Sequence, residues 1–250
     1  MKKTIILIHG VRGTHHGLSA VAQNLSQHYK VITPDLPGSG TRSELKNKTM
    51  DGYIEWLHHY IRNLHLSQKP YIIGHSMGSM VVSHYLEKYQ DEVQQKVVLM
   101  SPVFRPKKNQ KFSNFSFLAF NGFIHLIPKK ARYKFLGSKA ISYCISHYLT
   151  CDKTKQKQID QLHYRYSGRF SSAESITADV GISMREQTII PPNKDTLLIM
   201  GDSDKLTSLP MAHNYAKEDN VSIKIIPKTG HLINYEKPEK VAEIIANYIK

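Results

Sequence analysis

The sequence predicts an α/β protein in which about six mostly parallel strands form one sheet flanked by helices. Six short apolar runs, rich in isoleucine, valine and leucine, are separated by segments whose apolar residues recur at helical spacing. Polar residues that could do chemistry follow the ends of several of these runs, as they do at the carboxyl edge of a parallel sheet. Strands that alternate with helices along a chain usually form a parallel sheet covered on both faces.

The strands are expected where a continuous apolar run is too short to be a helix. They are predicted at residues 4–8, 31–33, 71–73, 97–100, 196–200 and 221–226. Runs of this kind, without alternating polar residues, are typical of strands buried on both faces of a parallel sheet.

Helices are expected between these strands, where apolar residues recur every three or four positions. The periodic segments are residues 18–25, 54–64, 77–84 and 238–249. Thr49 is a suitable N-cap for the second helix. Pro238 lies near the first turn of the last helix, where proline is tolerated.

The alternation stops between residues 103 and 190. This range contains all eight phenylalanines of the chain, including an apolar cluster from Phe115 to Ile127, and Pro191 and Pro192 follow it. We expect a largely helical insertion, so that residues 1–102 and 191–250 form the core and residues 103–190 an inserted subdomain. The phenylalanines suit a pocket for an apolar acyl or aryl group, or they form the core of the insertion itself.

The chain is strongly basic, with a formal net charge of +14. The predicted insertion carries 15 lysine and arginine residues against 5 acidic residues. Such a surface keeps a protein soluble, and it also attracts anionic partners, so weak association with an anionic membrane surface is an alternative expectation. Nucleic acid is not an expected partner, because no recognised binding module accompanies the charge.

Short patterns in the sequence bear on the compartment and on cofactors. The apolar run at residues 5–8 is too short for the core of an export signal, and no cleavage-site pattern follows it. The two cysteines do not make a disulfide framework, so we expect a cytoplasmic protein. The paired histidines at 15–16 and 58–59 lack the spacing of metal ligands, and we expect neither a metal nor a cofactor.

The most informative motif is Gly74-His75-Ser76-Met77-Gly78, which follows an apolar run and precedes a helical segment. In that context Gly-x-Ser-x-Gly predicts a nucleophile elbow, a sharp strand-to-helix turn that lifts a serine hydroxyl above the sheet. The turn is strained and crowded, and Gly74 and Gly78 supply the small residues it needs.

Three further polar clusters follow predicted strands. They are His9-Gly10-Val11, the pair Asp202 and Asp204, and His231. The separation of Asp204 and His231 fits one helical crossover to the adjacent parallel strand. From spacing alone, either aspartate could serve as the acid that orients the histidine.

With these motifs, the chain resembles the α/β-hydrolase superfamily, in particular its serine esterases and lipases. The resemblance covers nearly all of the chain apart from the insertion, which lies where the family carries its cap. It rests on His9-Gly10, residues 35–40, the elbow, Gly201-Asp202-Ser203-Asp204 and Gly230-His231. The family usually opens with two antiparallel strands, whereas this sequence begins at the strand before His9, so the resemblance implies a trimmed sheet of six strands.

The resemblance also implies roles for individual residues. Ser76 would be the nucleophile and His231 the base, with the backbone N–H groups of Met77 and Val11 as the oxyanion hole. The acid of the family lies third after the glycine, which favours Asp204 and leaves Asp202 to stabilise the loop. Outside the triad, we expect His9 to hold nearby loops. Arg12 is expected to face solvent, with contact to a substrate anion as the alternative.

The serine nucleophile narrows the chemistry that the resemblance implies. Dehalogenases and epoxide hydrolases of this family carry aspartate at the elbow, and proline-specific peptidases usually carry Gly-Gly-Ser-Trp-Gly, so neither group matches. The leading hypothesis is hydrolysis of carboxylic esters with small to medium acyl or aryl groups through an acyl-enzyme. The alternatives are a carbon–carbon bond hydrolase, or a non-catalytic protein that binds a ligand or a membrane surface. The natural substrate and the oligomeric state stay open.

Overall fold

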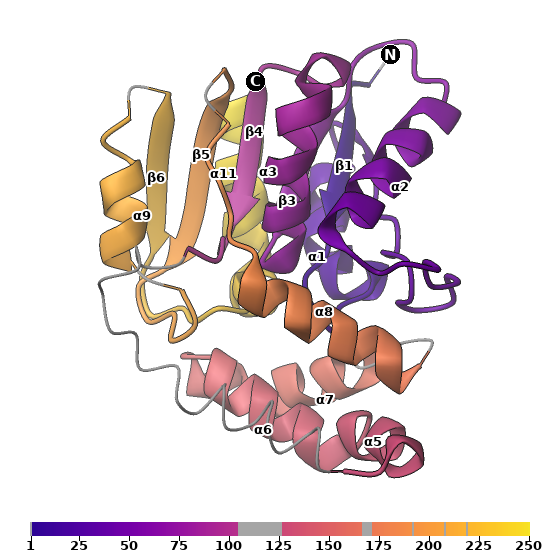
Figure 1. Ribbon diagram of the computed structural model, residues 1–250. Helices are drawn as coiled ribbons and strands as arrows, with labels where there is room; N and C mark the ends of the chain where they lie inside the picture. Colours follow the sequence, from indigo (N-terminus) through magenta and orange to yellow (C-terminus); the bar gives the residue numbers. More distant parts are fainter. Residues whose placement is uncertain (1, 105–126, 167–171, 192, 208, 219) are drawn as a thin grey trace.

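One sheet of six parallel strands forms the centre of the computed structural model, which describes residues 2–104, 127–166, 172–191, 193–207, 209–218 and 220–250 (Figure 1). The strand order is β2-β1-β3-β4-β5-β6. The strands are β1 (Thr4–Ile8), β2 (Lys30–Ile32), β3 (Tyr71–His75), β4 (Lys96–Met100), β5 (Asp195–Gly201) and β6 (Val221–Ile226). The predicted fold class and the six strands are therefore confirmed.

The two faces of the sheet pack into two separate apolar layers, because successive strand side chains point to opposite faces. Ile6, Ile72 and Leu99 belong to one layer, and their neighbours Ile5, Ile73 and Val98 belong to the other. Each fully buried aliphatic side chain stabilises the fold by about 1.5–3 kcal/mol relative to an exposed one.

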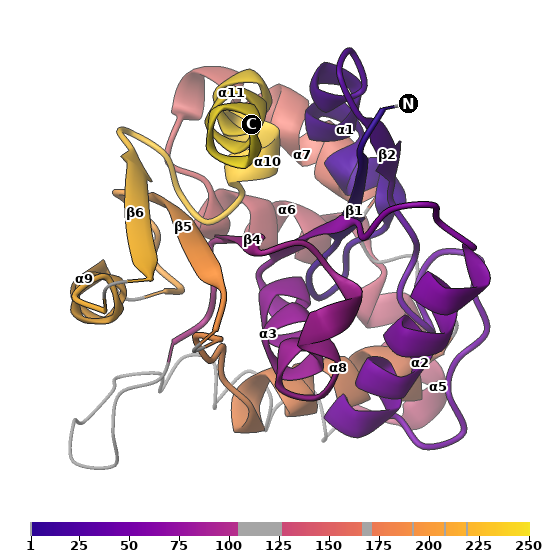
Figure 2. The same cartoon turned by 90° about the horizontal axis from the view of Figure 1, so that it is seen from above.

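Helices cover both faces of the sheet (Figure 2). Helices α2 (Met50–Asn63), α3 (Met77–Tyr89) and α9 (Leu209–Tyr215) pack on one face. Helices α1 (Ser19–Leu25), α10 (Ile233–Glu236) and α11 (Pro238–Ile249) cover the other. The short 3-10 helices η1 (His15–Leu18) and η2 (Gln90–Glu92) precede α1 and follow α3.

Most differences from the expected elements concern their ends. Strand β2 begins and ends one residue earlier than expected, because Lys30 pairs with Thr4 and Ile32 with Ile6. Strand β5 is one residue longer at each end. Thr49 caps α2 as expected, with its hydroxyl oxygen 3.1 Å from the Gly52 nitrogen that donates to it. Helix α9 supplies the crossover between β5 and β6.

A group of helices lies beyond the carboxyl ends of the strands, at the bottom of Figure 1. They are α5 (Lys129–Leu136), α6 (Lys139–Leu149), the 3-10 helix η3 (Lys153–Lys155), α7 (Gln156–Tyr166) and α8 (Ala173–Arg185). We call residues 127–190, as far as they are described, the helical segment. No strand occurs in its described part. Most of the predicted cluster from Phe115 to Ile127 lies outside the described residues.

The ends of the interrupted region meet beside the sheet. The N–H of Thr188 donates to the carbonyl oxygen of Val103 at 2.8 Å. Phe104 packs into the core and stacks on Tyr215, with ring centroids 4.5 Å apart, so this phenylalanine belongs to the sheet layer.

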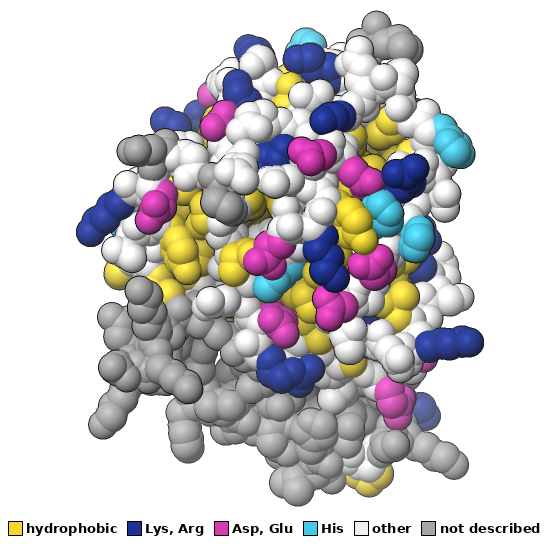
Figure 3. Space-filling view, turned by 45° about the horizontal axis from the view of Figure 1, so that its top comes forward, with side chains coloured by type: hydrophobic (Ala, Val, Ile, Leu, Met, Phe, Trp, Pro, Cys, Tyr) yellow, Lys and Arg dark blue, Asp and Glu magenta, His cyan; other side chains and the backbone are white. Residues whose placement is uncertain are grey.

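The face shown in Figure 3 carries acidic and basic side chains interspersed with each other. Among the described residues, no helix is both long and apolar enough to span a membrane.

Candidate active site

Ser76 lies in the turn between β3 and α3, at the centre of the carboxyl edge of the sheet. Its backbone has φ 53° and ψ −121°, which is unusual for a residue with a side chain and therefore costs conformational energy. The Ser76 N–H donates to the carbonyl oxygen of Met100 in the neighbouring strand at 2.9 Å. This bond holds the strained turn against β4.

The two glycines of the motif are required by close backbone approach. A Cβ atom on Gly78 would lie 2.6 Å from the carbonyl oxygen of His9 and closer still to that of Ile8. A Cβ atom on Gly74 would lie 2.6 Å from the Cα of Ser79. Helix α3 can therefore start directly against β1 and β3 only because both positions lack a side chain.

Ser76, His231 and Asp204 form one hydrogen-bonded line. The Ser76 Oγ lies 2.9 Å from Nε2 of His231, and the His231 Nδ1 lies 2.9 Å from Oδ2 of Asp204. Because a carboxylate only accepts, the proton of a neutral His231 belongs on Nδ1, which leaves Nε2 free to accept from the serine. The side chains of His231 and Asp204 are 2% and 0% exposed, so this line is shielded from water.

Asp204 is held by its own loop. Its carboxylate accepts from the backbone N–H groups of Leu206 at 2.8 Å and Thr207 at 3.0 Å, and from the Thr207 hydroxyl at 2.6 Å. Burial raises the pKa of Asp204, but its contact with His231 and these hydrogen bonds outweigh burial and lower the pKa below its usual value. Asp204 is thus an ionised partner for an imidazolium.

Asp202 has a different place. It is exposed, and its Oδ1 accepts from the Ser203 hydroxyl at 2.8 Å and from the Thr229 N–H at 3.3 Å. These bonds join the loop after β5 to the loop after β6. Of the two aspartates considered from the sequence, the structure brings only Asp204 into contact with His231.

The backbone around the serine has two positions suited to oxyanion donors. Met77 is the first residue of α3, where backbone N–H groups have no partner within the helix. Gly10 approaches the serine so closely that its Cβ would lie 3.3 Å from Ser76 Oγ, and Val11 follows it directly. Both residues named from the sequence therefore lie in segments that border the serine.

His9 links loops, in agreement with the expectation. Its Nε2 accepts from the Leu36 N–H at 2.9 Å, and its Nδ1 donates to the Gly10 carbonyl at 2.9 Å. Burial lowers the pKa of His9, so this ring is neutral and its two nitrogens have fixed roles.

Arg12 does not face solvent, and that expectation was wrong. Its guanidinium donates from Nη1 to the carbonyl oxygen of Leu136 at 2.8 Å, and burial lowers its pKa to about 10. Arg12 has a φ of 61°, in the left-handed region that residues with a side chain seldom adopt. Its burial depends on α5, which is more than a hundred positions away along the chain.

An apolar cluster borders the loop that carries Val11. Leu136 and Ile176 are buried, and Phe135 and Val11 pack against them. These side chains come from α5, α8 and the loop after β1. The loop after β1, which borders the serine, therefore contacts aliphatic and aromatic side chains of the helical segment.

Sequence reasoning missed three supporting residues. His75 was treated only as part of a motif, yet its Nε2 lies 3.2 Å from the carbonyl oxygen of His231. Thr207 and Glu236 hold the loops of Asp204 and His231. No spacing rule points to these residues, and the partners of His75 and Glu236 include residues far away along the chain. In the described part of the chain, no three histidine, cysteine, aspartate or glutamate side chains form a group that could hold a metal.

Comparisons with known proteins agree with the fold. A family model of the α/β-hydrolase fold matches residues 3–238. The monoacylglycerol lipase ABHD6 of Homo sapiens is 23% identical over 256 residues, which cover 99% of this chain and 75% of the lipase. The 2-hydroxy-6-oxo-6-(2'-aminophenyl)hexa-2,4-dienoic acid hydrolase of Metapseudomonas resinovorans is 24% identical, and the match covers 98% of this chain and 83% of that hydrolase.

Solved structures show the same likeness. A thermophilic esterase from Thermogutta terrifontis superposes with a TM-score of 0.81 at 21% sequence identity, covering 99% of this chain and 89% of the esterase. The match includes the helical segment as well as the sheet, because it spans nearly the whole chain.

Proposed function

The chain belongs to the α/β-hydrolase fold family, and on this basis we propose that it is a serine hydrolase that cleaves carboxylic esters with small to medium acyl or aryl groups. One observation carries the proposal. The strained Ser76, the buried His231 and the ionised Asp204 lie in a hydrogen-bonded line at the carboxyl edge of the sheet. This is the arrangement that activates a serine hydroxyl as a nucleophile.

The geometry supports a two-step mechanism. The Ser76 Oγ attacks the ester carbonyl carbon while its proton passes to Nε2 of His231, and Asp204 stabilises the resulting imidazolium. The tetrahedral intermediate collapses, and the leaving alcohol takes the proton from His231, which leaves an acyl group on Ser76. Water then attacks the acyl-enzyme, its proton passes to His231, and the carboxylic acid is released as Ser76 regains its hydrogen.

We assign the oxyanion hole to the backbone N–H groups of Met77 and Val11. The first lies at the N-terminus of α3, where the helix dipole favours negative charge. Loss of one such donor typically costs about 2.7–4 kcal/mol of transition-state stabilisation. Because both donors would be backbone groups, the side chains of these residues are free to serve the pocket, and Val11 packs against the apolar cluster.

The apolar cluster of Phe135, Leu136 and Ile176 next to Val11 supports a preference for apolar acyl or aryl groups. Pockets for acyl or aryl groups are mostly hydrophobic, with few polar anchors. The monoacylglycerol lipase and the esterase among the similar proteins favour the same substrate class. We propose in addition that residues 103–190 form a helical cap inserted into a core of residues 1–102 and 191–250.

The test is a series of p-nitrophenyl esters from acetate to palmitate, measured with the wild-type protein and with Ser76→Ala. We expect turnover of the short and medium esters by the wild type and none above background by Ser76→Ala. A wild-type protein that is folded but cleaves no ester of the series would contradict the proposal.

A carbon–carbon bond hydrolase is the second candidate, since one similar protein is named as the hydrolase of a hexa-2,4-dienoic acid. The same serine, base and oxyanion donors would suffice to hydrolyse a carbon–carbon bond of a vinylogous keto acid. Cleavage of such a dienoic acid at a kcat/KM well above that for every p-nitrophenyl ester would favour this reading over an esterase.

We also propose that the outer face of α6, η3 and α7 associates with anionic membrane surfaces. Between residues 139 and 166, exposed cationic side chains are Lys139, Lys153, Lys155, Lys157 and Arg165. The carboxylates in this range are Asp160, which is buried, and Asp152, which pairs with Lys237.

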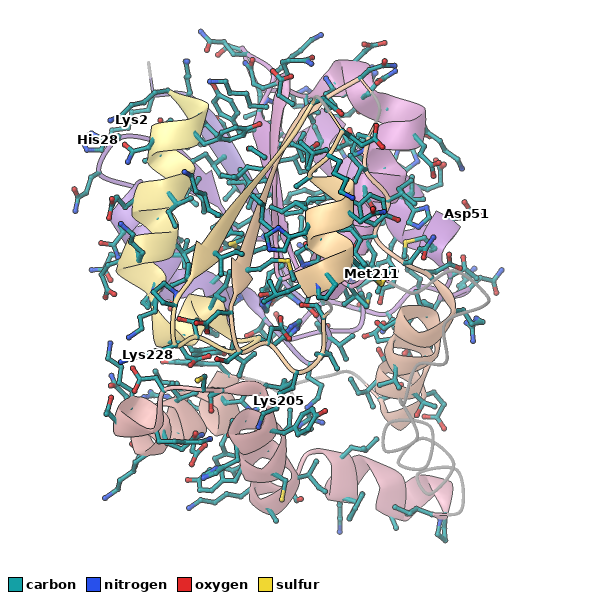
Figure 4. All side chains as sticks on the ribbon, turned by 90° about the vertical axis from the view of Figure 1, so that its left-hand side faces the viewer. Lys2, His28, Asp51, Lys205, Met211 and Lys228 are labelled. Atoms are coloured by element: carbon teal, nitrogen blue, oxygen red, sulfur yellow. The ribbon has the colours of Figure 1, made fainter. Side chains whose placement is uncertain are left out.

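Two exposed aromatic side chains lie among these cations. Tyr148 and Tyr164 are 51% and 44% exposed. Lys205 lies where the core faces the helical segment (Figure 4). Its Nζ is 5.6 Å from the centroid of the Tyr148 ring. Tyrosine is favoured at the membrane–water interface, and each lysine or arginine near an anionic surface contributes about 1 kcal/mol. A surface of this kind would bring an esterase close to lipid esters.

Membrane association can be separated from catalysis with the inactive Ser76→Ala protein. We expect it to sediment with phosphatidylglycerol vesicles and not with phosphatidylcholine vesicles, and we expect added salt to release it. Lys153→Glu with Lys157→Glu should weaken binding about tenfold or more. The control is Lys2→Glu with Lys30→Glu, at the opposite end of the strands. It makes the same charge change and should not weaken binding. Equal binding to both vesicle types would contradict the proposal. Vesicle binding by a protein that cleaves no substrate would instead favour a non-catalytic binding protein.

A further inference from the structure

The backbone of His231 is tied to the helical segment rather than to the sheet alone. The His231 N–H donates to the carbonyl oxygen of Leu149, the last residue of α6, at 2.7 Å. The preceding Gly230 lies against the same stretch, and a Cβ atom on it would lie 3.0 Å from the nitrogen of Cys151. We call residues 149–152, between α6 and η3, the linker.

A single buried carboxylate joins the linker to the histidine loop. Glu236 is 0% exposed. Its Oε1 accepts from the Gly230 N–H at 2.8 Å, and its Oε2 accepts from the N–H groups of Cys151 at 2.9 Å and Asp152 at 2.8 Å. Hydrogen bonds from backbone N–H groups to a carboxylate are stronger than those to neutral acceptors. Three of them converge here, one from the residue next to His231 and two from the linker.

We infer that Glu236 is a positioning residue for His231, and that it acts by holding the linker of the helical segment against residues 230–231. The inference rests on the proposed function for its catalytic meaning. Glu236 is suited to the task because an ionised carboxylate offers only acceptors, whereas an amide in its place would turn a donor toward at least one of the three N–H groups. The position of the helical segment and that of His231 are thereby coupled.

A second contact runs parallel to the first. Lys237 Nζ lies 3.0 Å from Oδ2 of Asp152, at the partly exposed rim of the same junction. Bonds to the Thr154 hydroxyl and to Lys237 lower the pKa of Asp152 to about 2, so this carboxylate is ionised at neutral pH. The rim pair is accessible to solvent and is expected to matter less than the buried bonds of Glu236.

The first test compares Glu236→Gln with Glu239→Gln, an exposed position three residues further on. For Glu236→Gln we expect kcat toward a p-nitrophenyl ester to fall on the order of 10–100-fold with KM within about twofold, because misplacement of a catalytic group lowers the rate more than binding. Hydrogen exchange should accelerate at residues 149–152 and 229–232 and stay unchanged in α11. Glu239→Gln should behave as the wild type in both measurements.

The second test removes one donor and leaves Glu236 in place. Asp152 has φ −71°, which proline can adopt, so Asp152→Pro deletes the N–H that donates to Glu236. Asp152→Ala loses the same side chain and keeps this N–H. We expect Asp152→Pro to reproduce the loss of kcat and the faster exchange, and its effect to be non-additive with Glu236→Gln.

The two measurements separate this inference from the proposed function. Hydrogen exchange reports the coupling even if no ester is cleaved. The absence of ester cleavage would count against the proposed function alone. If Glu236→Gln does not fold, the comparison of Asp152→Pro with Asp152→Ala still tests the inference. The inference would be overturned if the folded variants matched their controls both in hydrogen exchange at residues 229–232 and in kcat.

Discussion

The Nε2 of His75 lies 3.2 Å from the carbonyl oxygen of His231, so the residue before the elbow serine supports the backbone of the histidine that contacts this serine. Burial, followed by the proximity of His231, lowers the pKa of His75 to about 3. The ring is therefore neutral at physiological pH, and its Nε2–H is the donor because a carbonyl oxygen can only accept.

Replacing His75 should weaken catalysis through the position of His231. For His75→Phe, we expect kcat to fall roughly 3–10-fold, which corresponds to the about 0.5–1.5 kcal/mol that one hydrogen bond contributes. His75→Gln retains a donor and should recover part of this loss. Steady-state kinetics with a p-nitrophenyl ester and thermal unfolding of both variants check the prediction. Equal kcat for His75→Phe and the wild type would show that the bond does not position His231.

The choice between two neighbouring aspartates can be tested directly. We expect Asp204→Asn to lose on the order of 10⁴-fold in kcat, because an amide at this site favours the wrong tautomer of His231. Asp202→Asn should keep kcat within about threefold, since exposed side chains usually change free energies by less than 0.5 kcal/mol. Measured kcat values for the two variants on one ester decide between them. A larger loss in Asp202→Asn would reverse the assignment of the acid.

His75 and the two aspartates show how much of the fold and the site can be predicted from the sequence. Runs of β-branched residues and helical periodicity are local patterns, and they predicted the six strands and the main helices. The carboxyl edge of a parallel sheet gathers residues that follow its strands, which is why Ser76, His231 and an aspartate could be named together. Asp202 and Asp204 both follow β5, however, and the pattern alone leaves open which of them the loop turns toward His231.

Other features depend on contacts between distant parts of the chain. Arg12 is half-buried and its guanidinium donates to the carbonyl oxygen of Leu136 in α5, and nothing near Arg12 in the sequence signals this contact. Glu236 accepts from two backbone N–H groups of the linker at 149–152, which is far from it along the chain. Periodicity and motifs could not identify the contacts of either residue, because their partners depend on how the helical segment packs against the sheet.

Stability should fall in mild acid because of buried histidines such as His163. Its Nδ1 lies 2.9 Å from the Ser142 hydroxyl oxygen, and burial, with a contribution from Arg12, lowers its pKa to about 3. Between about pH 6.5 and pH 3 the unfolded chain therefore binds a proton at this residue that the folded chain does not. By linkage, the free energy of unfolding decreases as the pH falls through this window.

The size of this effect can be measured with His163→Gln. Between pH 7 and pH 5, His163 should account for about 2 kcal/mol of the wild-type loss in unfolding free energy, and the variant should lack this part. Urea unfolding at several pH values gives the comparison. Ser142→Ala removes the partner but keeps the buried imidazole, so it should retain the wild-type dependence. A variant with the same dependence as the wild type would mean that folding does not lower the pKa of His163.

The helical segment is also anchored by a buried ion pair, between Lys48 in the loop before α2 and Asp179 in α8. Lys48 Nζ lies 3.0 Å from Oδ1 of Asp179, and their side chains are 7% and 4% exposed. The hydroxyl of Tyr53 donates to the same Oδ1. Burial raises the pKa of Asp179 although Lys48 and Tyr53 act in the opposite direction, so this carboxylate depends on its partners.

Removing one member of this pair should cost more than removing both. Lys48→Met leaves a buried carboxylate without its cation, and we expect a loss of about 3–5 kcal/mol in the free energy of unfolding. Asp179→Leu leaves a buried cation and should cost a similar amount, whereas the double variant should cost less than the sum because neither charge remains. Urea unfolding of the four proteins provides the double-mutant cycle. Additive losses would indicate that Lys48 and Asp179 stabilise the protein independently, and α8 would then be held on the core mainly by its apolar contacts.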